Sequence, residues 1–252
     1  MTVEQLDYPG AKILMEANTQ QEMAYRIHSC QKEPWTVAMI ERMEPGDVLY
    51  DIGANVGAYT LVAAALHHRV VAIEPGYANY ARLCQNLTMN FDPPEGLEPE
   101  RSWLARVYAI HGALAQANGL AWLDYNDLRP GAASHAYGSE ERIYYHRQPV
   151  ATWALDQLVY AIGVPLPTHI KIDVDGAESM VIAGAAGILS GGTAPDGTAW
   201  VPPREIILEM QASDEAALVA QLDALGWRMT ERYSEREGKS MGHIAYGLFT
   251  RG

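Results

Sequence analysis

The chain has 252 residues, of which 48% are hydrophobic and two are cysteines, and its formal net charge is −13. It is long enough for one large core, while its charge excludes a broad electrostatic surface for nucleic acid and its cysteine count excludes a disulfide framework. Because it lacks a signal peptide and any apolar stretch of membrane-spanning length, we expect a cytoplasmic protein without nucleic-acid or membrane partners, and its oligomeric state stays open.

The earliest structural signal is a strand that begins at Val48 and leads into a glycine turn and a helix. Gly53 and Gly57 allow the backbone to turn sharply and a ligand to approach it closely. An Ala-rich helix is expected over Thr60–Leu66, and its free N–H groups favour a carboxylate or a phosphate. This order of elements is typical of a nucleotide-binding unit.

A second apolar strand, Val70–Ile73, follows the helix and ends in Glu74. Folds of this type place an acid at that position, where it accepts hydrogen bonds from ribose hydroxyls. Together with the glycine turn, Glu74 predicts a site for a cofactor that contains adenosine.

The residues of the glycine turn favour S-adenosylmethionine (SAM) over NAD. A dinucleotide fingerprint is G-x-G-x-x-G, and here Asn55 stands where the second glycine belongs. Asp51, at the end of the strand, would repel a pyrophosphate but attract the ammonium group of SAM. Since Asp and Asn are also common turn formers, a purely structural role is the alternative. An NAD-dependent oxidoreductase and a non-catalytic SAM-binding protein remain the competing functions.

Strands and helices alternate along the rest of the chain, with one interruption. Alternating pieces at 120–123 and 143–145 predict a β-hairpin insertion over about 119–150, and the Gly/Pro-rich run 191–203 predicts a surface loop. Further strands are expected at 107–110, 169–173, 205–209 and 243–249, and further helices at 77–90, 152–160, 178–189 and 215–225. This alternation predicts an α/β fold with a doubly wound, mostly parallel sheet.

Two motifs carry a family resemblance. Asp51-Ile-Gly-Ala-Asn-Val-Gly57 with Ile73-Glu-Pro75, and Ile170-Lys-Ile-Asp-Val-Asp-Gly-Ala-Glu178, resemble the FkbM family of class I SAM-dependent methyltransferases over about residues 33–209. The resemblance implies a Rossmann-like sheet of seven strands whose last strand is antiparallel. It also implies O-methylation of a hydroxyl on a sugar or small natural product. Asp175 departs from the pattern, because many members have Glu there.

The resemblance and the residue pattern together predict two parts of the chain and the residues that bind the cofactor. Residues 1–40 are expected to be an N-terminal extension that packs on the core, and residues 41–252 the methyltransferase domain. The residues predicted to bind SAM are Asp51, Gly53, Ala54, Asn55, Gly57, Glu74, Pro75, Asn79, Ala113 and Asp173.

Asp173 is the first candidate for catalysis. It follows a central strand at the edge of the sheet where ligands bind, and an unactivated hydroxyl needs a nearby group to take its proton. Asp175 and Glu178 are more simply explained as caps of the following helix. His135, in the loop of the hairpin insertion, is the second candidate base, although loop histidines are usually only solvated.

A metal ion is a further alternative. Asp173 and Glu209 end neighbouring strands and could share a divalent cation such as Mg²⁺. Nothing in their spacing requires a metal, because two acids at adjacent strand ends can equally orient SAM or the acceptor. The sequence therefore assigns no metal ligands, and it leaves open the acceptor, the choice between O- and N-methylation, and the base.

Overall fold

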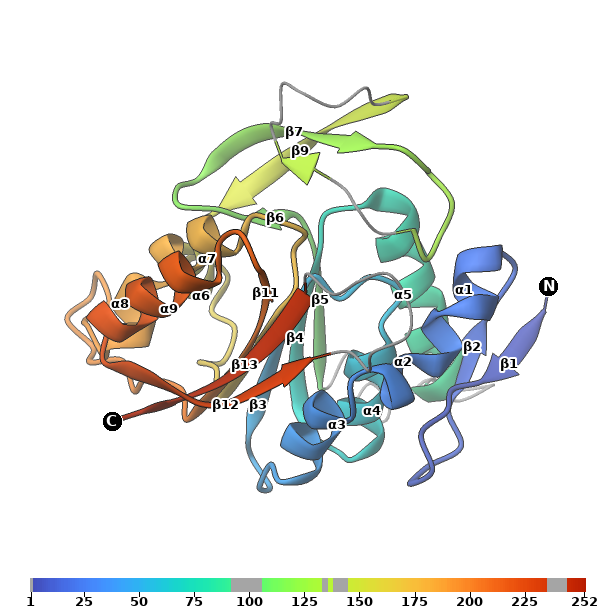
Figure 1. The fold of residues 1–252 in the computed structure, drawn as a ribbon, viewed down its shortest axis with the longest axis horizontal. Helices are drawn as coiled ribbons and strands as arrows, with labels where there is room; N and C mark the ends of the chain where they lie inside the picture. Colours follow the sequence, from blue (N-terminus) through green and yellow to red (C-terminus); the bar gives the residue numbers. More distant parts are fainter. Residues whose placement is uncertain (1, 92–105, 133–135, 138–144, 235–243) are drawn as a thin grey trace.

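A seven-stranded sheet runs through the centre of the computed structural model, which describes residues 2–91, 106–132, 136–137, 145–234 and 244–252 (Figure 1). The strand order is β12-β13-β11-β10-β3-β4-β5. The strands are β3 (Val48–Ile52), β4 (Arg69–Glu74), β5 (Val107–His111), β10 (His169–Ile172), β11 (Glu205–Gln211), β12 (Trp227–Ser234) and β13 (Ile244–Arg251). Strand β13 is antiparallel to both of its neighbours, and the pairs among β11, β10, β3, β4 and β5 are parallel. The predicted α/β fold with a mostly parallel, seven-stranded sheet is confirmed.

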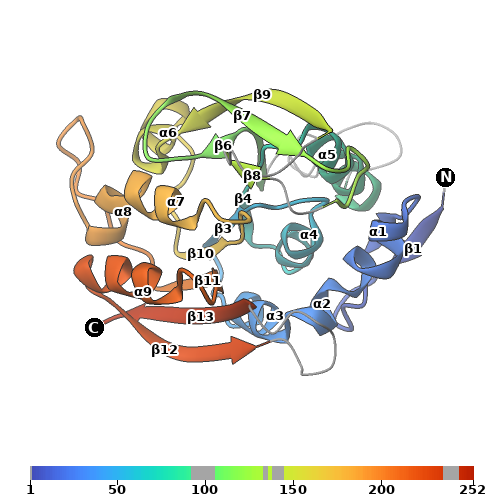
Figure 2. The same cartoon turned by 45° about the horizontal axis from the view of Figure 1, so that its top comes forward.

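Helices cover both faces of this sheet, which explains why its central strands are apolar on both sides (Figure 2). One face packs against α3 (Pro34–Glu41), α4 (Ala58–Ala65) and α5 (Tyr77–Phe91). The other packs against α6 (Leu155–Ile162), α7 (Glu178–Gly184), α8 (Ala186–Ser190) and α9 (Glu215–Ala224). No helix in the part of the chain that the structure describes is long and apolar enough to cross a bilayer.

Two predicted helices differ from the structure by more than one or two residues at an end. The helix expected from 152 begins at Leu155, because Thr152 and Trp153 complete a strand. The single helix expected over 178–189 is broken into α7 and α8 at Ala185. The break has a local cause: the Asp156 carboxylate accepts hydrogen bonds from the backbone N–H groups of Gly187 and Ile188, which caps α8.

Several elements were not predicted. Strand β12 lies at the edge of the sheet and its side chains are largely exposed, so its sequence lacks the apolar run of the central strands. The N-terminal residues form short elements for which the sequence carries no clear pattern. They are β1 (Val3–Gln5), β2 (Leu14–Glu16), α1 (Gln20–Ala24), the 3-10 helix η1 (Arg26–His28) and α2 (Ser29–Lys32).

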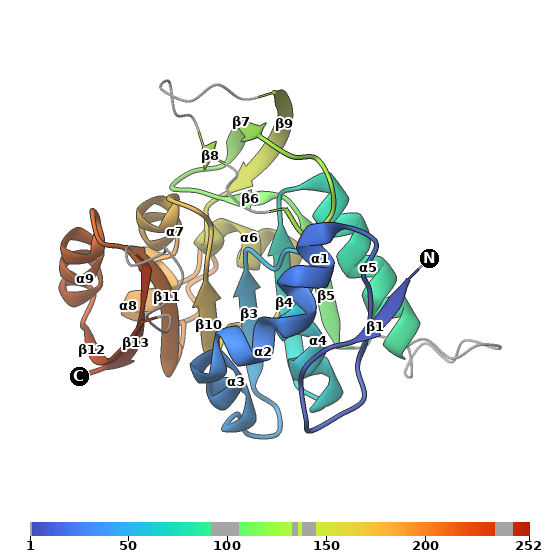
Figure 3. The same cartoon turned by 45° about the vertical axis from the view of Figure 1, so that its right-hand side comes forward.

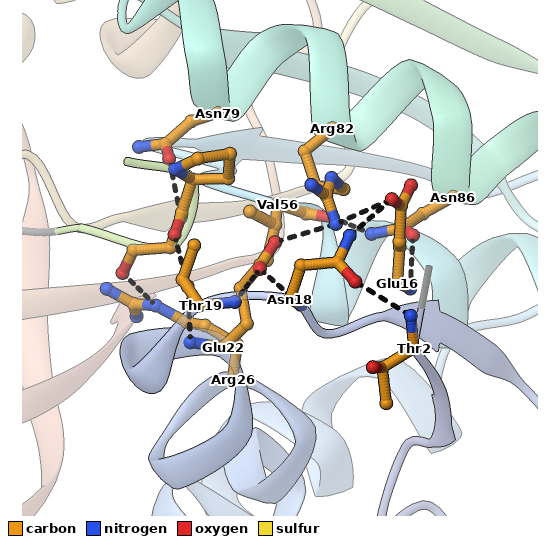
Figure 4. A network of polar contacts seen from close by, with 12 residues as sticks. Thr2, Glu16, Asn18, Thr19, Glu22, Arg26, Val56, Asn79, Arg82 and Asn86 are labelled. Atoms are coloured by element: carbon orange, nitrogen blue, oxygen red, sulfur yellow. Dashed lines mark hydrogen bonds and ion pairs between the residues drawn. The ribbon is translucent and has the colours of Figure 1, made fainter. Parts of the chain in front are cut away.

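A buried ionic network fixes this N-terminal segment to α5 (Figure 4). Arg82 of α5 forms ion pairs with Glu16 at 3.4 Å and with Glu22 at 3.1 Å. Beside it, the Asn86 side chain accepts a hydrogen bond from the N–H of Glu16 and donates one to the carbonyl of Val56, each at 2.9 Å. Because Val56 belongs to the glycine turn, the segment is tied to both α5 and the turn.

The hairpin insertion belongs to a second, four-stranded sheet in the order β6-β9-β7-β8. Its strands are β6 (Ala113–Leu114), β7 (Gly119–Tyr125), β8 (Ala136–Tyr137) and β9 (His146–Trp153). Figure 3 shows this sheet beyond the carboxyl ends of β3, β4 and β5. Strand β9 begins at His146, and most of the piece predicted at 143–145 lies outside the described residues.

Candidate functional site

A cavity of about 410 Å³ lies at the carboxyl ends of the central strands. It is bounded by the turn after β3, the end of β4, the loops after β5 and β10, the end of β11, the small sheet and the N-terminal helices. The strand order reverses at β3: β4 and β5 follow on one side of it, and β10 lies on the other. Open α/β sheets bind ligands at such a reversal, and the cavity lies there. Its volume falls within the range of about 300–1,000 Å³ typical of small-molecule sites.

The backbone conformation of the turn after β3 shows why glycine is required at positions 53 and 57. Gly53 has φ +84°, and a Cβ atom there would lie 1.8 Å from the carbonyl oxygen of Asp173. Gly57 has φ +95°, and its Cβ would lie 2.4 Å from the Leu83 side chain. Gly57 is also the residue before α4, so the turn aims the start of that helix toward the site. Gly53 lines the cavity and Gly57 does not.

Glu74 lies at the end of β4, lines the cavity and is 3% exposed. Its carboxylate accepts hydrogen bonds from the backbone N–H groups of Asn55 and Gly76, each at 2.8 Å. These contacts fix the orientation of the carboxylate between the glycine turn and the chain after β4. Burial outweighs them and raises the pKa of Glu74 to about 7.

This pKa predicts a pH-dependent difference in stability between the protein and a Glu74→Gln variant. The folded pKa is above the unfolded value of 4.5, so the stability that protonated Glu74 contributes is fully present below pH 4.5. It is lost as pH rises to about 7. We expect the free energy of unfolding of the wild type to fall relative to the variant by about 1–3 kcal/mol over this interval. Urea unfolding of both proteins at several pH values measures it, and parallel curves would contradict it.

The other residues predicted to bind the cofactor take different places. Pro75 and Ala113 line the cavity. Ala54 donates its backbone N–H to the carbonyl of Ile73 and borders a smaller cavity instead. Asn79 lies behind the wall, where its side chain accepts from the N–H of Gly131 at 2.9 Å. Asn79 therefore shapes the loop that faces Glu74.

Asp51 lies beneath the cavity and does not line it. It is fully buried, and its carboxylate accepts a hydrogen bond from the Thr60 hydroxyl at 2.6 Å. Burial raises the pKa of Asp51, an effect that the nearby Lys171 ammonium opposes. The Oδ1 atom of Asp51 has no hydrogen-bond partner among the described residues. The predicted contact with the cofactor's ammonium group stays a prediction.

Asp173 projects from the end of β10 into the cavity and pairs with a buried lysine. The Nζ atom of Lys171, which is 2% exposed, lies 2.8 Å from Oδ2 of Asp173. Burial alone would raise the pKa of Asp173, but the Lys171 charge outweighs burial and lowers it. The same ammonium lies 5.0 Å from the centre of the Tyr59 ring. Asp173 is therefore an ionised carboxylate that faces the cavity.

Glu209, at the end of the neighbouring strand β11, also lines the cavity. Its carboxyl group accepts a hydrogen bond from the Tyr246 hydroxyl at 2.7 Å. Burial raises the pKa of Glu209 to about 9, and the nearby Asp173 charge adds to this rise. At neutral pH the site thus holds an ionised carboxylate next to a protonated carboxylic acid.

The turn after β10 does not bear out the prediction that Glu178 caps the following helix, because α7 begins after Ala177 without a side-chain cap. Glu178 instead binds the turn that precedes the helix. Its carboxylate lies 3.3 Å from the N–H of Val174 and 3.2 Å from the N–H of Gly176, and accepts hydrogen bonds from both. Asp175 has a left-handed backbone with φ 54° and lines the cavity. Glu178 therefore closes the turn that presents Asp173 and Asp175.

Two predictions cannot be placed on the structure. His135, the second candidate base, lies outside the described residues. For the predicted divalent cation, no group of three or more His, Cys, Asp or Glu side chains in the described ranges is arranged to hold a metal ion. Asp173 and Glu209 do line the same cavity.

One wall of the cavity was not predicted from the sequence. Gln21, Tyr25, Arg26 and Lys32, all from the N-terminal helices, face the ends of the central strands. The roles of Lys171 and Tyr246 were not predicted either. Arg26 and Lys32 stand in no recognisable motif, and their only signal in the sequence is positive charge in an acidic chain.

Comparisons with known proteins point to one family. Residues 51–219 match the family model described as the methyltransferase FkbM domain. The chain is 25% identical over 169 residues to the hexuronic acid methyltransferase AglP of Haloferax volcanii. That match covers 67% of this chain and 62% of the relative, so the chain spans less than two thirds of the relative's length.

Two solved structures share the fold. The methyltransferase FkbM of Methylobacillus flagellatus KT aligns with a TM-score of 0.53 and 13% identity, covering 82% of this chain and 44% of that one. The TYW2 protein of P. horikoshii, solved in complex with MeSAdo, aligns with a TM-score of 0.53 and 12% identity, covering 99% and 71%. At such low identities these structures support the fold and say nothing about the acceptor.

Proposed function

The chain belongs to the FkbM methyltransferase family, and we propose that it is a SAM-dependent methyltransferase that methylates a hydroxyl group of a sugar, with a hexuronic acid as the first candidate acceptor. The similarity to a hexuronic acid methyltransferase supports the acceptor class. The observation that carries the choice of a hydroxyl is the Asp173 carboxylate, which lines the cavity and is kept ionised by Lys171.

The residues around the cavity fit the parts of SAM. Glu74 presents a fixed carboxylate, which suits the two hydroxyls of a ribose. Ile73, Ala113 and Leu114 give an apolar wall beside it, which suits an adenine ring. Asp51, which has a buried oxygen without a partner among the described residues, lies beneath the cavity and does not line it. Glu74 and the apolar wall thus match a ligand with a diol and an apolar ring.

The bound cofactor supplies an electrophilic methyl group on a sulfonium. The protein's own residues must hold the acceptor oxygen and receive its proton. Asp173 is placed to accept that proton, because it is ionised and projects from the end of a central strand. Glu209 is protonated and can donate a hydrogen bond to the same oxygen, since the Tyr246 hydroxyl occupies only one of its carboxyl oxygens.

The acids at this end of the cavity favour a hydroxyl over a carboxylate as the methyl acceptor. Asp173, Asp175 and Glu209 all line it. A carboxylate acceptor would be repelled by Asp173 and would need no base, so the ionised Asp173 would have no use there. A neutral hydroxyl can donate to Asp173 without this repulsion.

Thermal melts test the cofactor assignment directly. S-adenosylhomocysteine (SAH), the demethylated cofactor, should stabilise the protein, because its site exists only in the folded chain. At one hundred times its dissociation constant the gain should be about 2.7 kcal/mol. NAD at the same concentration should leave the melting temperature unchanged. A melt raised by NAD and unmoved by SAH would overturn the assignment, and SAH binding with no transfer to any sugar would favour a non-catalytic SAM-binding protein.

A further inference from the structure

A second cavity adjoins the glycine turn. It is small, about 30 Å³, and lies between the N-terminal helices and the start of α4. It shares Arg26, Lys32, Gly53, Asn55 and Asp173 with the main cavity. Its remaining walls come from Ser29, Glu33, the turn, the first residues of α4 and Lys171. Asp173 and Glu33 are the acids that line it, whereas Asp175 and Glu209 do not.

Arg26 lines this second cavity, and one nitrogen of its guanidinium group anchors it to the backbone. Its Nε atom donates a hydrogen bond to the carbonyl oxygen of Gly131 at 2.9 Å. Among the described residues its two terminal nitrogens make no further hydrogen bond or ion pair. The charge of Arg26 also acts to lower the pKa of both Glu74 and Asp173, against the larger effect of burial. Arg26 lines the main cavity, and its charge acts on both of these carboxyl groups.

Two other positive groups face the same space. Lys32, the last residue of α2, lines both cavities, and its charge likewise favours ionised Asp173. Helix α4 begins after Gly57 without a side-chain cap. The first N–H groups of a helix have no partner within the helix, so the start of α4 attracts negative charge. With Lys171, four sources of positive potential thus face a cavity that is also lined by two acids. Lys171 pairs with Asp173 at 2.8 Å and Lys32 with Glu33 at 3.6 Å, so Arg26 and the start of α4 add positive potential beyond these two pairs.

The rest of the N-terminal segment is built to keep Arg26 there. Glu22 of α1 is fully buried and paired with Arg82 of α5. The Thr19 hydroxyl donates to the carbonyl of Pro130 at 2.8 Å, next to the Gly131 carbonyl that anchors Arg26. Breaking such a buried pair is costly, so the position of Arg26 over the turn is fixed by the fold.

We propose that Arg26 and Lys32, together with the start of α4, form a carboxylate subsite that binds the amino-acid end of SAM. The inference rests on the proposed function and makes the extension, residues 1–40, part of the cofactor site of the domain at 41–252. Asp173 also lines the subsite, but there the charges of Arg26 and Lys32 act against its own. Because the subsite borders the glycine turn, where the cofactor is expected to bind, the cofactor is the better source of the carboxylate than the acceptor.

Calorimetric titration with two ligands tests the subsite. SAH carries the amino-acid end, and 5′-methylthioadenosine has the same adenosine part without it. An Arg26→Met variant should bind SAH about 10- to 100-fold more weakly, the loss expected for a hydrogen bond to a charged group. Its affinity for methylthioadenosine should change less than about twofold, since no carboxylate is lost. Lys32→Met should show the same pattern with a smaller loss, and Arg26→Lys should restore part of the SAH affinity.

Lys12→Met is the matched control, because it removes the same charge from an exposed position of the N-terminal segment. It should bind both ligands as the wild type does. Equal losses for both ligands in Arg26→Met would mean that Arg26 only supports the fold, which overturns the subsite. Unchanged SAH affinity would also overturn it. If a raised KM for a carboxylate-bearing sugar accompanied that unchanged affinity, the carboxylate would belong to the acceptor. A wild type that binds neither ligand would instead refute the proposed function.

Discussion

An Asp173→Asn variant should bind SAH as tightly as the wild type and lose on the order of 10²–10⁴-fold in turnover, the usual cost of removing a general base. Asn keeps the shape of the side chain at the end of β10 but cannot take a proton from the acceptor. A methyl-transfer assay with a sugar acceptor, combined with an SAH titration, measures both quantities. Full activity in a folded variant would sink this assignment and move the base to His135 or to the substrate.

Two controls separate catalysis from stability and from metal binding. Asp173→Asn leaves the buried Lys171 ammonium without its 2.8 Å partner, so the variant should also melt lower. The double variant Asp173→Asn with Lys171→Met removes both charges and should recover part of that stability without recovering activity. If Asp173 instead helps to hold Mg²⁺, a chelator should abolish the wild-type activity and added Mg²⁺ should restore it.

Replacing Glu74 by Ala should weaken SAH binding on the order of 10²-fold or more. A fixed carboxylate at this place can accept hydrogen bonds from both ribose hydroxyls, and bonds to a charged group are worth about 1.5–3 kcal/mol each. Methylthioadenosine has the same ribose, so it should lose as much affinity as SAH does. Calorimetry with both ligands measures the effect.

Glu74→Gln is the control for the fold around the ribose site. The Ala variant also removes the acceptor for the N–H groups of Asn55 and Gly76, whereas Gln keeps one oxygen to accept. Unchanged affinity for both ligands in a folded Glu74→Ala protein would show that the carboxylate plays no part in binding.

The main parts of the fold could be predicted because they depend on local patterns. The apolar run that ends in Glu74 and the two glycines before α4 specify a parallel strand, a turn and a helix without reference to the rest of the chain. The backbone at Gly53 shows why: a Cβ atom would collide with Asp173, so the turn tolerates no other residue. Asp51, Glu74 and Asp173 each stand at the carboxyl end of a parallel strand. Their shared position at one end of the sheet could therefore also be predicted from local patterns.

What could not be predicted depends on contacts between distant segments. Arg26 is held at the site by contacts with distant segments: it donates to the carbonyl of Gly131, and Glu22 of the same segment pairs with Arg82, 60 residues further along the chain. Lys171 stands within an apolar strand, and its partner Asp173 is only two residues away. The sequence does not show how deeply Lys171 is buried, and this burial is what makes its charge decisive for the ionisation of Asp173. The edge strand β12 was not predicted, because its side chains are mostly exposed and form no apolar pattern. It is stabilised instead by its pairing with β13.

The proposed function is tested most directly by the fate of the methyl group. The protein is incubated with SAM that carries an isotopically labelled methyl and with a glycoside of a hexuronic acid, and the product is analysed by NMR. We expect the label in a methyl ether on a ring hydroxyl, with no transfer by Asp173→Asn. A methyl ester on the carboxyl group, or label that never reaches a sugar in a panel of acidic and neutral glycosides, would contradict the account.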